Sequence, residues 1–197
     1  MMTTDDKNLL TNQVQTDVSL ISFLSVISVF FIGALLPQFN SYDLSVRIPI
    51  SFLIVSTFAL IISGLILSNA SQKIIEGNSQ KVKKYLAWGY AISEYMGVFL
   101  FIISVPLAMS IITADLYLRI ITFVSAILGL GFYQLMGFSL LDNNFTKSSK
   151  LISILIILFG IALFVSQVLA FHFTLVSIVF LLFILLITCI GPIEKFR

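Results

Sequence analysis

The sequence predicts an all-α membrane protein: a bundle of six transmembrane helices in three hairpins, with both termini in the cytoplasm. Two features of its composition indicate that lipid, rather than water, surrounds most of the chain. Of the 197 residues, 59% are hydrophobic and only 10% are charged, whereas a soluble domain carries about 25% charged residues. The mean hydropathy of +1.11 agrees with this interpretation.

Six segments are long and apolar enough to cross a bilayer, which takes roughly 20 mostly apolar residues in a helix. Their apolar residues run continuously, without the alternation of barrel strands, and backbone amides in lipid must be satisfied within their own element. Helices are therefore expected. The six segments are 18–36, 48–68, 85–112, 116–141, 151–171 and 174–190.

The ends of the chain divide it into three parts. Residues 1–17 are polar and lack the basic start and cleavage site of a signal peptide. We expect them to be a disordered cytoplasmic tail, followed by a transmembrane domain at 18–190 and a second cytoplasmic tail at 191–197. The last two apolar segments are separated only by the tripeptide "FHF". A tight hairpin is expected there, because the alternative, one helix of about forty residues, is too long for a single crossing.

Lysine and arginine residues gather in alternate loops, the pattern that orients membrane proteins. The loops 69–84 and 142–150 and the C-terminal tail hold eight of them, whereas the opposite loops hold only Arg47 and Arg119. We therefore expect the lysine-rich side to face the cytoplasm and the protein to lie in the cell membrane. Basic residues beside a helix end attract anionic lipid headgroups. The lysines of the first of these loops are candidates for that contact: Lys73, Lys81, Lys83 and Lys84.

Composition and motifs exclude several classes of function. The net charge of +2 is too small to indicate a nucleic-acid partner, and a single cysteine and a single histidine cannot form a disulfide or a metal cluster within the chain. No catalytic or nucleotide-binding motif is present. We therefore expect no enzyme activity, no metal and no cofactor. The expected partners are the lipid bilayer and further protein subunits, in a homo-oligomer or a larger membrane complex.

The first two hairpins share a pattern. Residues 29–37 and 98–106 each begin with valine and end with proline, and each stretch is followed by the string D-L-x-x-R-I. This favours a parallel repeat of one helical hairpin, although chance similarity between apolar segments is the alternative.

The repeated string contains a charged pair in each copy. Asp43 and Asp115 come where a helix is expected to begin, so each carboxylate can cap exposed amides. Arg47 and Arg119 follow one turn later, within reach of the aspartate of the same copy. We expect the pairs to anchor helices at the outer interface; the alternative is that they line an outer vestibule.

Glu94 is a carboxylate inside the third apolar segment, ten residues past Lys84 and so roughly 15 Å from it along a helix. A charge inside the membrane is costly and almost never faces lipid. Tyr90 lies one turn earlier on the same face. If the fourth segment runs back beside the third, Tyr133 and Gln134 reach nearly the same depth and can meet Glu94.

Small residues at four-residue spacing let membrane helices approach closely. The third and fourth segments both carry such ridges, so we expect them to pack together. The ridge beside Glu94 is formed by Gly89, Ser93 and Gly97. The ridge of the fourth segment is formed by Ser125 and Gly129 and, eight residues further on, Gly137.

Two interpretations of Glu94 stay open. In the structural one, a protonated Glu94 shares a hydrogen bond with Gln134 or Tyr133 and locks two helices together, with a contribution of about 1 kcal/mol. In the functional one, Glu94 exchanges a proton or binds a cation during transport. The corresponding functions are a small transporter or channel subunit, and a non-catalytic structural or assembly subunit of a membrane complex.

Overall fold

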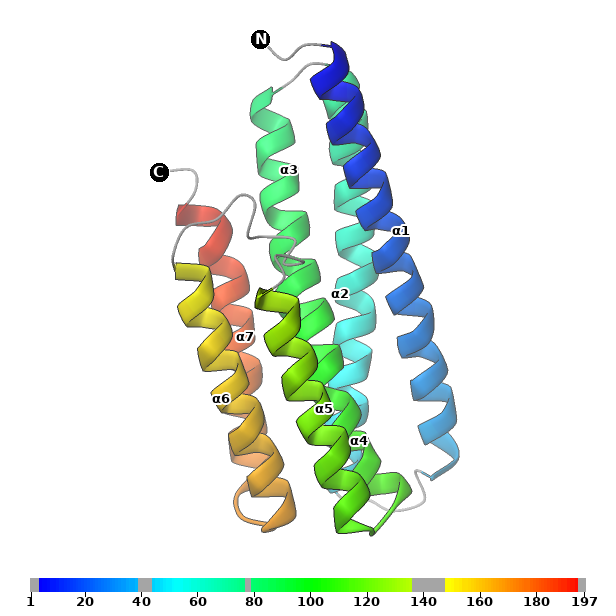
Figure 1. Cartoon of the computed structure of the whole chain (residues 1–197), viewed down its shortest axis with the longest axis vertical. Coiled ribbons are helices and arrows are strands. Elements are labelled where there is room, and N and C mark those ends of the chain that lie inside the picture. The colour runs from blue at the N-terminus through cyan, green and yellow to red at the C-terminus, as the bar shows by residue number, and fades with distance from the viewer. Residues whose placement is uncertain (1–3, 39–43, 77–78, 136–147, 195–197) are drawn as a thin grey trace.

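The chain forms a bundle of long helices that lie side by side (Figure 1). The computed structural model describes residues 4–38, 44–76, 79–135 and 148–194. Within these ranges every regular element is helical, as the sequence predicts. The elements in chain order are α1 (Thr4–Leu35), η1 (Leu36–Gln38), α2 (Leu44–Ile75), α3 (Ser79–Ala91), η2 (Ile92–Phe99), α4 (Leu100–Ile112), α5 (Leu116–Leu135), α6 (Ser148–Val168) and α7 (Phe173–Glu194).

The third apolar segment is one continuous rod made of α3, η2 and α4. η2 is a π-helical segment of eight residues, and its flanking residues Ala91 and Leu100 both have right-handed helical torsion angles. The backbone therefore passes through η2 without a break, although its hydrogen-bond pattern changes there.

Five helices of the described residues are long and apolar enough to cross a membrane. They are Lys7–Leu35, Val46–Ile75, Lys81–Ile112, Leu116–Tyr133 and Phe173–Ile190. α6 adds a shorter apolar stretch, Ile154–Val168. The protein is therefore an integral, multi-pass membrane protein. The start of α1 and the end of α7 lie toward the same end of the bundle (Figure 1).

The first three spans pack along stripes of residues seven positions apart, the spacing of helices that pack as coiled coils. α1 buries Val14, Ile21, Ser28 and Leu35. α2 buries Leu53, Leu60, Leu67 and Ile74, with Ser56, Ser63 and Ala70 between them. These stripes face each other and the α3–η2–α4 rod, so most of the core lies among these three spans. Buried residues of the later helices, such as Ile156, Phe180 and Ile184, complete it.

The beginning of α1 differs from the expected disordered tail, because the helix already starts at Thr4. Val14 is fully buried and Asp17 is half-buried. The reason is the stripe just described: Val14 stands seven residues before Ile21, so the apolar face continues into the polar N-terminal sequence. The polar residues 7–13 lie mostly on the exposed side of these turns.

Two of the helices are longer than a single membrane crossing requires. α1 and α2 have 32 residues each, which is about 48 Å at 1.5 Å per residue, whereas the hydrocarbon core is about 30 Å thick. Figure 1 shows α1 and α3 projecting beyond α5, α6 and α7 at the end where the N-terminus lies. The lysines of α3 lie in this projecting part.

The last two helices are joined by the expected short turn. α6 ends at Val168 and α7 begins at Phe173. Ala170 and His172 adopt left-handed torsion angles, with φ of 52° and 48°, and the Phe171 amide donates to the Ser166 carbonyl at 3.0 Å. These two residues reverse the chain direction within four positions.

Candidate functional site: a buried carboxylate on a π-helical segment

Glu94 is the third residue of η2 and is only 1% exposed. It lies 18 residues before Ile112, about 27 Å along the helix axis. The candidate span runs from Lys81 to Ile112, so Glu94, 13 residues after the first and 18 before the second, lies near its middle. A carboxyl group buried among helices costs free energy unless it is hydrogen-bonded, protonated or paired with a cation.

The π-helical hydrogen-bond pattern around Glu94 is supported by a neighbouring helix. Ser56 of α2 donates its hydroxyl to the Gly97 carbonyl at 2.8 Å, and Ser56 is completely buried. A π segment shifts the backbone ladder to i→i+5 bonds, and a side chain from another helix here supplies an additional bond to one of its carbonyls. Ser93, next to Glu94, donates to the Tyr90 carbonyl at 3.1 Å.

The small-residue ridge beside Glu94 contacts α2. A Cβ atom on Gly89 would lie 2.6 Å from Cδ2 of Leu67, and one on Gly97 would lie 2.6 Å from Cδ2 of Leu60. Ser93 is buried between the two glycines. Leu60 and Leu67 belong to the seven-residue stripe of α2, so the ridge and the stripe interlock.

The ridge expected on the fourth segment has no such neighbour in the part that the structure describes. Ser125 is exposed, and a Cβ on Gly129 would meet nothing within 4 Å. Gly137 lies outside the described residues. In the described part of the chain, the Gly89–Gly97 ridge therefore pairs with α2 rather than with Ser125 and Gly129.

α5 nevertheless reaches the end of η2 through an aromatic contact. The Tyr133 ring meets Phe99 edge-on at a centroid distance of 6.0 Å, and Phe99 meets Tyr95 in the same manner at 6.0 Å. Tyr133 thus packs against Phe99, the last residue of η2. Its expected hydrogen bond with Glu94 stays a prediction. The side chain of Gln134 lies outside the described part of the chain.

Tyr90 is hydrogen-bonded to Asp17, a carboxylate that the sequence interpretation did not include among the candidate site residues. Its hydroxyl donates to Oδ2 of Asp17 at 2.8 Å, and Tyr90 itself is 3% exposed. Asp17 was assigned to the N-terminal tail, but it belongs to α1. The signal that reveals it is its register: Asp17 stands three residues after Val14 and four before Ile21, on the buried stripe.

Other buried polar groups tie the helices together. Ser28 of α1 and Thr57 of α2 share a hydrogen bond of 2.7 Å, and Thr57 also donates to the Leu53 carbonyl at 2.8 Å. Gln167 of α6 donates to Oγ of Ser110 at 2.6 Å and to the Leu107 carbonyl at 3.1 Å. Such bonds between membrane helices are worth about 0.6–1.7 kcal/mol each.

The two Asp–Arg pairs of the repeated string differ in how much of each the structure describes. Asp115 caps α5, because its Oδ1 accepts from the amides of Tyr117 at 2.8 Å and Leu118 at 3.4 Å. No ion pair joins Asp115 to Arg119, although both residues are described; the carboxylate is committed to the cap instead. Asp43 lies outside the described residues, and Arg47 is half-buried in the first turn of α2.

The four candidate lysines differ in their surroundings. Lys73 of α2 forms an ion pair with Glu76, its Nζ lying 2.7 Å from Oε2. The other three, Lys81, Lys83 and Lys84, are exposed on the first turns of α3.

Glu94 lines neither of two surface hollows that described residues form, one between α2 and α3 and one at the turn between α6 and α7. Among the described residues, no three histidine, cysteine, aspartate or glutamate side chains gather as a metal site requires.

Comparison with protein-family models, with curated proteins and with solved structures gives no match to this chain. The site is therefore interpreted from its own geometry.

Proposed function

We propose that the protein is a small transporter or channel subunit in which Glu94 exchanges a proton or binds a cation. The observation that carries the proposal is the burial of this carboxylate, 1% exposed, on a π-helical segment within a membrane span. Intramembrane ionisable residues are rare and mark ion or proton pathways. π-helical turns inside α-helices are also frequent at functional sites.

The Asp17–Tyr90 pair supports a proton or cation path from the lysine-bearing end. Tyr90 lies one turn from Glu94 toward that end, and its hydroxyl contacts the Asp17 carboxylate at 2.8 Å. A tyrosine hydroxyl both donates and accepts hydrogen bonds, so Tyr90 can pass a proton between groups on its two sides. Asp17 is then the first acceptor and Glu94 the inner one.

The proposed topology has six crossings in three hairpins, with both termini in the cytoplasm of a cell. It is supported by the lysines of α2 and α3 at one end of the bundle, whereas Arg47 and Arg119 are the only lysine or arginine residues at the other end among the described residues. Single cysteines at Glu76 and Ala114, in a Cys189→Ser background, test the orientation. An impermeant maleimide applied outside intact cells should label the Ala114→Cys protein and not the Glu76→Cys protein; the reverse result would overturn it.

Flux measurements in proteoliposomes test the transport function. Vesicles containing the wild-type protein should carry protons or a common cation faster than empty vesicles. Glu94→Gln should abolish the flux or its pH dependence, and Asp17→Asn should reduce it. Glu76→Gln, which removes an exposed carboxylate from the Lys73 pair, is the matched control and should transport normally. Wild-type vesicles that carry no tested ion would refute the proposal.

A second function, a non-catalytic subunit that assembles a homo-oligomer or a larger complex, is favoured by α5. Ser125 and Gly129 of this helix form a small-residue stripe with nothing packed against Gly129. Such stripes promote helix association in membranes. A cysteine at Ser125 that crosslinks two copies or a partner in native membranes, together with absence of flux, would favour assembly over transport.

A further inference from the structure

A hollow of about 310 Å³ opens between α2 and α3, at the end of the bundle where the lysines gather. It is lined by Ile66 of α2 and by Lys81, Lys84, Tyr85 and Trp88 of α3. We propose that this hollow binds one anionic phospholipid, with the phosphate between the two lysines and the upper acyl chain against Ile66 and Trp88. This inference is independent of any transport through Glu94.

The walls of the hollow match an amphiphilic ligand. Lys81 and Lys84 are three residues apart, so their ammonium groups lie on one face of α3 and can contact one phosphate. Trp88 is one turn further toward the membrane, where aromatic side chains prefer the boundary between headgroups and hydrocarbon. A free phosphate ion would use the lysines alone and leave the apolar wall of Ile66 and Trp88 without a ligand.

The close approach of the two helices shapes this wall. A Cβ on Gly89 would lie 2.6 Å from Cδ2 of Leu67 and 3.4 Å from Cγ2 of Ile66. The missing side chain at Gly89 therefore lets α2 come near enough for Ile66 to line the same hollow as Trp88. The hollow is a consequence of helix packing, which lysine content alone does not provide.

The four lysines look equivalent in the sequence, but the structure places only two of them at the hollow. Lys81 and Lys84 line the hollow, whereas Lys73 and Lys83 do not. Diffuse attraction to an anionic membrane would depend equally on Lys81, Lys83 and Lys84, because all three are exposed on the same turns. A specific site depends on Lys81 and Lys84 only, which makes Lys83→Gln a matched control.

Trp88 is the only tryptophan in the chain, so its fluorescence reports on this hollow directly. The experiment places the full-length protein in phosphatidylcholine nanodiscs that contain a small fraction of phosphatidylglycerol with brominated acyl chains. Bromine quenches a tryptophan that it contacts. Brominated phosphatidylglycerol should quench Trp88 more strongly than the same fraction of brominated phosphatidylcholine. Lys81→Gln and Lys84→Gln should each weaken the apparent affinity about fivefold, as expected for one basic residue at an anionic surface.

Lys83→Gln should stay within about twofold of the wild type, and circular dichroism should show equal helicity in all variants because the three lysines are exposed. Three results would overturn the site: equal quenching by the two lipids, an equal loss in Lys83→Gln, or displacement of the brominated lipid by millimolar inorganic phosphate at constant ionic strength. The last would assign the lysines to a soluble anion.

Discussion

The α3–η2–α4 rod and α5 carry the same kind of sequence signal and have opposite surroundings. Each holds small residues at four-residue spacing, yet a Cβ on Gly89 or Gly97 would clash with a leucine of α2, while one on Gly129 or Gly131 would meet nothing within 4 Å. In the rod, 61% of the most apolar stretch is buried; in α5 the share is 6%. Small residues therefore permit close packing, and a neighbouring helix decides whether it happens.

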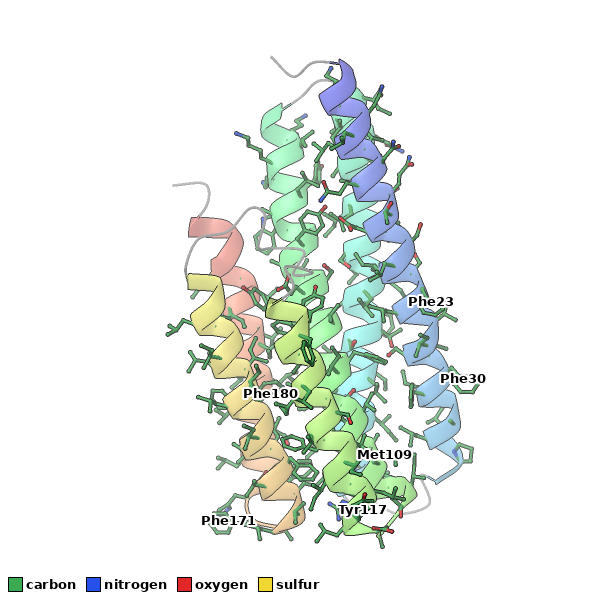
Figure 2. All side chains as sticks on the ribbon, in the orientation of Figure 1. Phe23, Phe30, Met109, Tyr117, Phe171 and Phe180 are labelled. Atoms are coloured by element: carbon green, nitrogen blue, oxygen red, sulfur yellow. The ribbon has the colours of Figure 1, made fainter. Side chains whose placement is uncertain are left out.

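The difference extends to the large apolar residues. The rod buries Phe99, Leu100 and Leu107 almost completely, whereas α5 exposes Leu128 and Phe132 by 55% and 56%. In a membrane these exposed side chains contact lipid tails, which are as apolar as they are. Figure 2 shows the same outward direction for Phe23 and Phe30 on α1, and the opposite one for Phe180, which lies inside the bundle.

The largest expected difference between the two regions comes from truncating Glu94. Glu94→Ala leaves a cavity and removes a buried polar group, so we expect it to lower the free energy of unfolding by about 2–4 kcal/mol. Glu94→Gln keeps the shape of the side chain and should cost less than half as much. Phe132→Ala, on the exposed face of α5, should change stability by less than either. Unfolding by SDS titration in mixed micelles measures all three, and equal losses for Glu94→Ala and Phe132→Ala would contradict the comparison.

The glycines provide the most direct contrast. Gly89→Ala places a methyl group against fully buried Leu67, and such overpacking costs about 1–3 kcal/mol. Gly129→Ala has open space and should be neutral or stabilising, since alanine favours a helix by up to about 1 kcal/mol over glycine. The thermal unfolding midpoints of the two variants in detergent test this prediction. The double variant Gly89→Ala/Leu67→Ala should be less destabilised than the sum of its single changes; strict additivity would show that the two side chains do not compete for space.

Removing the hydroxyl group of Tyr90 or of Tyr117 should have a smaller effect on stability. Tyr90→Phe removes the hydrogen bond to Asp17 within the core and should cost about 1–2 kcal/mol. Tyr117→Phe on α5, where the side chain is 69% exposed, should leave stability within about 0.5 kcal/mol. If Tyr117→Phe proves as costly as Tyr90→Phe, the Asp17 contact is not what stabilises the first three spans.

The smallest predicted effect concerns the serines. Ser56→Ala removes the bond to the Gly97 carbonyl and should cost about 0.6–1.7 kcal/mol, whereas Ser125→Ala should be neutral. Amide hydrogen exchange can localise the change, because exchange should accelerate within η2 in Ser56→Ala and stay unchanged in Ser125→Ala. Uniform acceleration along the whole rod would argue against a specific role of Ser56 in holding the π-helical segment.

The positions of most helices could be predicted from the sequence, because the hydropathy of a segment depends only on its own residues. The start of α5 at Leu116 and its Asp115 cap agree with what the sequence predicts for the fourth segment. The short turn before Phe173 agrees as well. The helix at the start of the chain was not predicted, because most residues there are polar. Only Val14 and Asp17 continue the buried stripe of α1 into this part. The π-helical form of residues 92–99 has no local signal in the sequence; it depends on packing that includes the Ser56 hydroxyl of another helix.

The sequence by itself determined that this protein lies in a membrane, that its elements are helices, and that a carboxylate stands inside one of them, because those properties follow from side-chain solvation and backbone hydrogen bonding within single segments. Only the tertiary structure decided which of two similar ridges is packed, that Asp17 meets Tyr90, and that two of four lysines line a hollow. These are contacts between segments far apart in the chain, and a helix of lipid-soluble residues carries no local mark that distinguishes a face turned to lipid from one turned to protein.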